Sequence, residues 1–128
     1  MAQQLTVEVT FPFHILLYPA PDVPGDWIGH ALELDVVAQG TSEQHAREMV
    51  LGAVQVLIKY NAEHGLVPIQ IRFAPPEAWA AAGVPIPASL DVKTTMRTTP
   101  EPSAKPFDFA DLPLSFETIV AERAPVAP

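Results

Sequence analysis

The chain has 128 residues, no cysteine and a formal net charge of −8. A domain of this length can bury roughly two-thirds of the surface that its unfolded form exposes, so an independent hydrophobic core is feasible. The absence of cysteine excludes disulfides and thiolate metal sites and is compatible with a reducing cytoplasm. We therefore expect a cytoplasmic protein. No apolar run approaches the ~20 residues that a membrane span requires.

The charge is distributed unevenly along the chain. Arg47 is the first Lys or Arg, and the acidic residues that precede it are Glu8, Asp22, Asp26, Glu33, Asp35 and Glu43. Nucleic-acid affinity depends mainly on Lys and Arg side chains that displace counterions from phosphates. The N-terminal third has none, so it favours a basic partner rather than DNA or RNA.

The first predicted strand region covers residues 4–18. Apolar and polar residues alternate in its first half, and Pro12 interrupts the pattern. The region is therefore either two short strands or one strand with a kink at an edge. The stretch that follows, "YPAPDVPGDW", is rich in proline, aspartate and glycine and is typical of a loop.

A second strand is predicted from Trp27 to Ala38. Strict alternation would place Ile28 and His30 on a core face. It would place Trp27, Glu33 and Asp35 on the opposite face, toward solvent or a partner. The same alternation separates His30 from the two acidic residues.

Gly40 ends that strand, and "TSEQ" at residues 41–44 is typical of a capping box with Thr41 as the N-cap. Apolar residues then recur at spacings of three and four, which predicts a helix that runs to about His64 and ends at Gly65. We expect a further strand over residues 69–73.

The rest of the chain begins with a short helix and then becomes rich in proline. "PEAWAAAG" predicts a short helix with Pro76 near its start and Gly83 at its end. Beyond it the sequence indicates an extension. We therefore divide the chain into a domain at residues 1–83 and an extension at residues 84–128, in which residues 107–122 recover apolar character and could form a docking strand.

Glu33 and Asp35 are the candidate catalytic or metal-binding residues. Two carboxylates separated by one residue on a strand point the same way and can serve acid–base or divalent-cation chemistry. The simpler interpretation is a solvated strand face, because exposed acidic residues are the norm. The sequence has neither a Gly-x-Ser-x-Gly motif nor a His-x-x-x-His spacing. We predict no catalytic residue, cofactor or metal.

The segment "WIGHALELDVVAQGTSEQHAREM" resembles the N-terminal domain of the HicB-like antitoxin family. The family pattern has an aromatic residue on a strand, a "clel"-type stretch, a glycine, and then a helix capped by Thr or Ser. The segment from His14 to Ile58 carries this order, and residues 69–73 extend it.

The resemblance implies an α+β fold. It consists of an antiparallel sheet of three or four strands covered on one face by a long helix, and is described as a reduced ribonuclease-H-like or double-stranded-RNA-binding-like module. Family antitoxins bind a small basic toxin that cleaves mRNA. Many carry a C-terminal DNA-binding domain, but between Pro85 and Pro128 the basic residues are only Lys93, Arg97, Lys105 and Arg123. We do not expect direct DNA binding.

The leading hypothesis is a non-enzymatic binding module that contacts a basic protein, such as a HicA-like toxin, through Trp27, Glu33 and Asp35. Because a small sheet leaves strand edges to be paired or protected, we also expect a homodimer or higher homo-oligomer. One alternative is a metal-dependent hydrolase that uses Glu33 and Asp35. Another is a scaffold or assembly protein that acts through its C-terminal extension.

Overall fold

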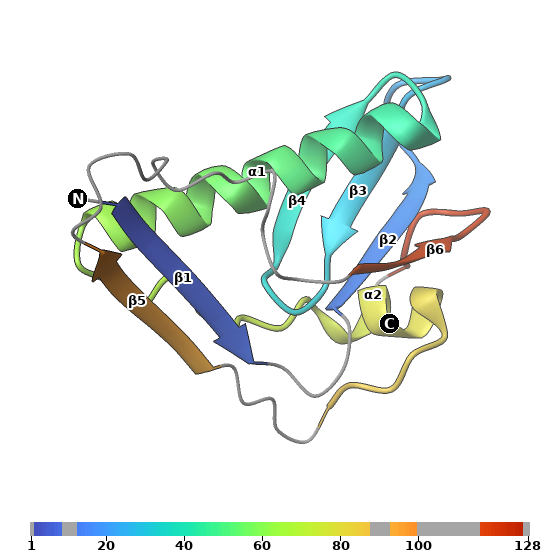
Figure 1. The fold of residues 1–128 in the computed structure, drawn as a ribbon. Helices are drawn as coiled ribbons and strands as arrows, with labels where there is room; N and C mark the ends of the chain where they lie inside the picture. The colour runs from blue at the N-terminus through green and yellow to red at the C-terminus, as the bar shows by residue number, and fades with distance from the viewer. Residues whose placement is uncertain (1, 9–12, 88–92, 100–115, 127–128) are drawn as a thin grey trace.

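The computed structural model describes residues 2–8, 13–87, 93–99 and 116–126. Within them the fold is α+β, with two helices, a four-stranded mixed sheet and a separate two-stranded ribbon (Figure 1). The elements are β1 Ala2–Glu8, β2 Phe13–Pro19, β3 Trp27–Ala31, β4 Val36–Gly40, α1 Glu43–Glu63, α2 Pro76–Ala82, β5 Lys93–Thr99 and β6 Phe116–Val120.

The strand order of the larger sheet is β4-β3-β2-β6. Strand β3 is antiparallel to both β2 and β4, whereas β6 is parallel to β2. The expectation of a wholly antiparallel sheet is therefore wrong at β6. The chain between Pro19 and Phe116 is far longer than the roughly one dozen residues that a parallel connection needs. Strand β6 lies inside the predicted docking segment 107–122, of which residues 107–115 lie outside the described part of the chain.

The single strand predicted from Trp27 to Ala38 is instead a hairpin, β3–β4. Residues 32–35 form its turn. Leu32 and Leu34 are both buried, but they belong to different hydrophobic clusters on opposite sides of the sheet. In a continuous strand, residues two apart share a face. The prediction of one continuous strand was wrong because the apolar and polar residues of the turn alternate as they would in a strand. In addition, no glycine or proline marks the end of β3.

Helix α1 covers one face of the β2–β3–β4 hairpins (Figure 1). Its buried residues lie one turn apart and pack against inward-facing residues of β2 and β3; the main members of this core are Phe13, Ile15, Leu17, Ala31, Ala46, Val50, Val54 and Ile58. Glycines permit the close approach. A Cβ on Gly29 would lie 2.8 Å from the carbonyl oxygen of Ala46, and one on Gly40 would collide with the backbone nitrogen of Ala46.

The prediction of a long capped helix is confirmed, with a different N-cap residue. The hydroxyl of Ser42, not Thr41, accepts the backbone N–H of His45 at 3.0 Å. The backbone N–H of Thr41 donates to Nδ1 of His45 at 2.9 Å. The helix ends at Glu63, and Gly65 follows with φ +70°, a left-handed conformation that suits glycine.

The predicted short helix is confirmed as α2, which packs on the opposite face of the sheet. Trp79 is 1% exposed and lies in a second hydrophobic cluster with Leu16, Leu32, Ala74 and Ala78. Its indole Nε1–H donates to the carbonyl of Ala74 at 3.1 Å, so burial of the ring leaves no unpaired donor.

The strand predicted over residues 69–73 is wrong. This segment forms no ladder, although Ile69 is buried against the α1 side of the sheet. Its end bonds to the β3–β4 turn instead. The backbone N–H of Arg72 donates to the carbonyl of Glu33 at 2.9 Å, and that of Ala74 donates to Leu32 at 2.8 Å. Bonding to a turn satisfies the backbone without extending the sheet.

Strands β1 and β5 pair with each other in an antiparallel ribbon, from Ala2 opposite Thr99 to Glu8 opposite Lys93. Because β1 and β2 are separate strands in different sheets, the two-strand alternative for residues 4–18 is confirmed. Strand β5 pairs with β1 and strand β6 with β2, so segments on both sides of Gly83 contribute to each sheet.

Candidate functional site

The turn between β3 and β4 positions both of the acidic residues singled out from the sequence. Asp35 has φ +52°, a left-handed conformation that Asp tolerates better than most residues. This conformation turns the chain so that Glu33 points into the protein and Asp35 lies at the surface. The prediction that the two carboxylates share one solvated face is therefore wrong. Each carboxylate contacts a different histidine.

Glu33 is fully buried, with 0% of its surface exposed, and its partner is His14 of β2. One carboxylate oxygen, Oε1, accepts the backbone N–H of His14 at 2.8 Å. The other, Oε2, lies 2.6 Å from Nδ1 of the same residue. Both oxygens are thus hydrogen-bonded, as a buried carboxylate requires. The contact joins the β3–β4 turn to strand β2.

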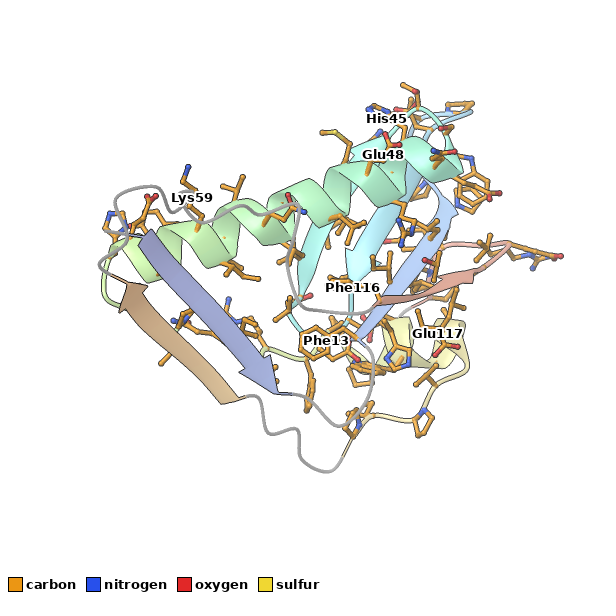
Figure 2. The ribbon with its side chains drawn as sticks, viewed as in Figure 1. Phe13, His45, Glu48, Lys59, Phe116 and Glu117 are labelled. Atoms are coloured by element: carbon orange, nitrogen blue, oxygen red, sulfur yellow. The ribbon has the colours of Figure 1, made fainter. Side chains whose placement is uncertain are left out.

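The ring of His14 lies between two carboxylates and an indole. Its Nε2 is 3.7 Å from Oε2 of Glu117 on β6, and the ring meets Trp79 edge-on at a centroid distance of 6.2 Å. Figure 2 shows Glu117 on the same side of the sheet as α2. His14 therefore connects β2, β6, the turn and α2, and we assign it a structural role.

His30 pairs with Asp35, contrary to the expectation that alternation separates them. Nε2 of His30 lies 2.7 Å from Oδ1 of Asp35, and His30 is only 6% exposed. The turn brings the carboxylate back over the end of β3. Sequence reasoning missed this pair because it treated residues 32–35 as a continuation of the strand.

A hollow of about 270 Å³ lies beside His30, between the sheet and α2. Its polar lining groups are His30, Tyr18 and Glu77, and the rest of its wall is apolar. Burial raises the pKa of the Tyr18 phenol above its ordinary value. A histidine oriented by a carboxylate can act in proton transfer. The residues that line this hollow include no Ser, Thr, Cys or Lys that could act as a nucleophile.

The carboxylates of Glu33 and Asp35 are not arranged to share a cation. Across the described ranges, no group of three or more His, Cys, Asp and Glu residues is placed to hold a metal ion. A divalent cation in a protein usually takes several oxygen ligands. Here one carboxylate is buried against His14 and the other is bonded to His30.

Trp27 is half-buried at the start of β3. It pairs with Gly40 across the hairpin and packs against the hydrophobic cluster beneath α1. The face that the sequence suggested was open to a partner is therefore the face that α1 covers.

One end of the molecule collects acidic side chains that the strand analysis did not group. Asp22 and Asp26 lie in the β2–β3 loop, and Glu43 begins α1; Figure 1 shows the loop and the start of the helix at the same end. Oδ2 of Asp26 accepts from the side chain of Gln39 at 2.8 Å. We call these three residues the acidic end. The uneven charge of the N-terminal third was the signal for it.

The nearest basic residue to the acidic end is engaged elsewhere. Nε of Arg47 donates to the hydroxyl of Thr118 on β6 at 2.9 Å. Glu43, Arg47, Thr118 and Val120 line a shallow hollow of about 330 Å³ between the start of α1 and the end of β6. The acidic end therefore adjoins a recess with an exposed apolar residue, Val120, at its edge.

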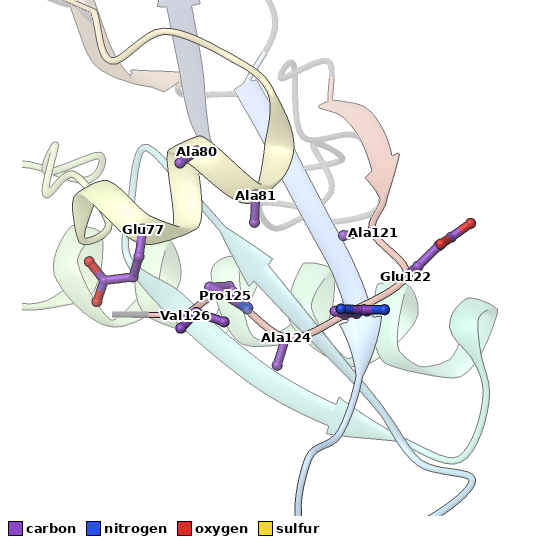
Figure 3. Close-up of a pocket in the computed structure, with 9 residues that line it drawn as sticks. Glu77, Ala80, Ala81, Ala121, Glu122, Ala124, Pro125 and Val126 are labelled. Atoms are coloured by element: carbon purple, nitrogen blue, oxygen red, sulfur yellow. The ribbon is translucent and has the colours of Figure 1, made fainter. Parts of the chain in front are cut away.

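A larger hollow, of about 570 Å³, lies between α2 and the chain that follows β6 (Figure 3). Alanine side chains from both segments line it, and its charged lining groups are Glu77, Glu122 and Arg123. These groups make no cluster with acid–base or metal-binding geometry. We therefore do not place the function there.

The side of α1 that faces away from the sheet carries exposed apolar residues. Val56 is 67% exposed and Tyr60 is 54% exposed, and Met49 is also exposed. Met49 is apolar but lies outside the buried stripe of the helix. That stripe runs through Ala46, Val50, Val54, Ile58 and Asn61.

In the described part of the chain no helix is long and apolar enough to cross a membrane. Comparison with known proteins gives no match to a family model, to a curated protein or to a solved structure.

Proposed function

We propose that this chain is a non-enzymatic, HicB-like binding module that contacts a basic protein in the cytoplasm. A small basic toxin that cleaves mRNA is the partner class that the family resemblance implies. What supports the proposal is the order of three consecutive antiparallel strands followed by a capped helix that covers one sheet face. The resemblance implies a sheet of three or four strands covered on one face by a long helix, which agrees with this order in outline only.

The acidic end is the observation that carries the proposal. Asp22, Asp26 and Glu43 bring formal negative charges to one end of the molecule, beside a recess edged by Val120. The start of α1 opposes them with a macrodipole equivalent to roughly half a positive charge. Arg47 in the recess adds one positive charge, so the three carboxylates still leave this end negative. The net field at this end attracts cations and steers a basic partner.

The partner contacts proposed from the sequence were Trp27, Glu33 and Asp35. Asp35 lies at the surface in the β3–β4 turn, at the other end of strand β3 from the acidic end, so it is a separate proposed contact. Glu33 is buried against His14, so in this proposal it acts by holding the turn that presents Asp35. Trp27 supports the hairpin from beneath α1. Reversing the charge of Glu33 would test folding, and reversing that of Asp35 would break its bond to His30, so neither variant isolates binding.

The test is a calorimetric titration of the chain with a small basic mRNA-cleaving toxin of the HicA-like class, at low and high salt. We expect the double variant Asp22→Lys/Glu43→Lys to bind about tenfold more weakly at low salt, with a smaller difference at high salt. Glu63→Lys, an exposed acidic residue at the opposite end of α1 from the acidic end, is the matched control. Equal affinity of the double variant and the control would reject this surface.

The hydrolase alternative has one observation in its favour, the His30–Asp35 pair beside a hollow that Tyr18 also lines. A thermal-shift measurement with Mg²⁺ and Mn²⁺ separates it from the binding module. Stabilisation by either ion that is lost in Asp35→Asn would support the hydrolase.

The scaffold alternative is harder to test by truncation. Strand β6 lies in the extension and pairs with β2 from Phe13 opposite Phe116 to Leu17 opposite Val120. Deleting residues 84–128 would remove a strand of the sheet and so would not isolate the extension. The exposed substitution Val126→Glu leaves the sheet intact, and loss of assembly in that variant would support a scaffold.

A further inference from the structure

We propose that the outward side of α1 is a self-complementary interface, at which a second copy of this chain packs its own α1 antiparallel. The proposal goes beyond partner binding, because this surface shares only Glu48 with the recess beside the acidic end. We call it the outer face of α1 and define it by Glu48, Met49, Gly52, Val56, Lys59 and Tyr60. Figure 2 shows Lys59 on the side of α1 away from the sheet. Glu48 lies at the margin of the outer face, where it also lines the recess toward β6 and accepts from the side chain of Gln44 at 3.2 Å.

The centre of the outer face consists of a gap at Gly52 next to the protruding side chain of Val56. Gly52 lacks a side chain, and nothing lies within 4 Å of where its Cβ would be. Val56, one turn later, is 67% exposed. A glycine in an exposed helix interior costs about 1 kcal/mol relative to alanine, so it needs a reason. Close approach of another helix backbone is such a reason, and a valine from that helix would fill the gap.

The two flanks of the outer face differ in character. With 3.6 residues per turn, Met49 and Tyr60 fall on one side of the Gly52–Val56 centre, whereas Glu48 and Lys59 fall on the other. The ring of Tyr60 stacks on His64 of its own chain at 4.0 Å, which orders it beside the centre. One flank is thus apolar and aromatic, and the other carries opposite charges.

This arrangement selects a second copy in the antiparallel orientation. With the two-fold axis near residue 54, Gly52 of one copy lies opposite Val56 of the other. Tyr60 then lies beside the second copy's Met49, a favourable sulfur–aromatic pair. On the other flank Glu48 lies beside the second copy's Lys59, so opposite charges meet.

The parallel orientation gives a poorer match. A two-fold axis along the helices would set the charged flank of each copy against the apolar flank of the other. Glu48 would then face Met49, and Lys59 would face Tyr60, with no opposite charge across the contact. Lys59 also pairs with Glu63 of its own helix at 3.9 Å, an exposed contact that contributes little.

Sedimentation of the full chain over a range of concentrations tests the proposal. We expect a dimer that dissociates on dilution, and a dissociation constant that rises at least about tenfold in Val56→Glu, because the substitution buries a carboxylate at the centre. Val126→Glu, at a valine that is 81% exposed outside α1, is the matched control and leaves the constant unchanged. Circular dichroism checks that each variant keeps its helices.

Charge exchange tests the orientation. Glu48→Lys alone and Lys59→Glu alone each weaken the antiparallel dimer, because each creates a like-charge contact. The double variant Glu48→Lys/Lys59→Glu restores opposite charges across the interface, and its dissociation constant returns close to that of the wild type. Failure of the double variant to recover would overturn the antiparallel arrangement.

Two further results would overturn the interface itself. One is a chain that stays monomeric at concentrations up to about 1 mM, which corresponds to an association too weak to be specific. The other is a dimer that survives Val56→Glu but is lost in Val37→Glu. Val37 is 54% exposed on the edge strand β4, so that result would assign association to strand pairing.

Discussion

Oε2 of Glu33 lies 2.6 Å from Nδ1 of His14, and this contact joins the β3–β4 turn to strand β2 within the protein. The turn also receives a backbone N–H from the segment after α1, through Arg72. Glu33 therefore lies where the turn, the sheet and the approach to α2 meet. Its carboxylate binds His14 of β2 and its backbone carbonyl accepts from Arg72, which makes it a residue of the fold rather than of the surface.

Removal of this carboxylate should destabilise the protein strongly. In Glu33→Ala the backbone N–H and ring of His14 lose their acceptors, and a cavity is left. We expect a loss of roughly 3 kcal/mol in the free energy of unfolding, measured by urea titration. Glu33→Gln preserves the shape and one acceptor, so it should lose less. Glu63→Gln, an exposed carboxylate on α1, is the control, and an equal loss in that variant would contradict the structural role of Glu33.

The glycines beneath α1 should tolerate substitution very differently from the one on its outer face. A methyl group at Gly40 meets the backbone of Ala46, which cannot move without shifting the helix. We expect Gly40→Ala to cost about 3 kcal/mol, at the upper end for overpacking. Within a single copy, Gly52→Ala meets nothing within 4 Å, so at concentrations where the chain is monomeric it should stabilise the helix by about 1 kcal/mol. Thermal unfolding measures both, and similar effects would contradict the packing of α1.

The turn should depend on the conformation and the side chain of Asp35 together. Asp35→Ala loses the bond to His30 and places an alanine at φ +52°, so we expect a loss of about 2 kcal/mol. Asp35→Asn keeps a hydrogen-bonding side chain that tolerates this backbone and should lose less. Chemical denaturation measures the free energy of unfolding of the two variants. A larger loss in Asp35→Asn than in Asp35→Ala would show that the His30 contact does not support the turn.

Tyr18 should titrate at a higher pH in the folded protein than in the unfolded chain, because burial raises the pKa of its phenol. The protein has two tyrosines, so Tyr60→Phe leaves Tyr18 as the only one. Ultraviolet titration of that variant should give a pKa above about 10 when folded and near 10 in urea.

The raised pKa also fixes the sign of a stability change. The folded state holds the Tyr18 proton more tightly than the unfolded state does, so the stabilising contribution is complete below the unfolded pKa. It is lost as the pH rises through the folded pKa. Denaturation of Tyr60→Phe in alkaline buffers should show this decline, and the additional Tyr18→Phe substitution should reduce it. An unchanged slope would contradict burial of the phenol.

Local sequence signals predicted the two helices and their ends. The spacing of apolar residues along α1, Pro76 at the start of α2, and Gly65 and Gly83 at φ +70° and +71° all act within a few residues of their own position. Such signals can be read directly because helix periodicity and glycine conformation are local properties. The acid excess before Arg47 likewise indicated the acidic end.

Contacts between distant segments decided the rest. Whether residues 32–35 continue a strand or turn back depends on His14, eighteen or more positions earlier, and on Arg72 and Ala74, far later in the chain. The parallel pairing of β6 with β2 joins residues about one hundred positions apart, so no local pattern could predict it. The alternation of apolar and polar residues indicates which side chains prefer burial. It does not distinguish a continuous strand from a hairpin, because both conformations can bury Leu32 and Leu34. Only the tertiary hydrogen bonds and packing selected the one that hides Glu33, exposes Asp35 and leaves the outer face of α1 open.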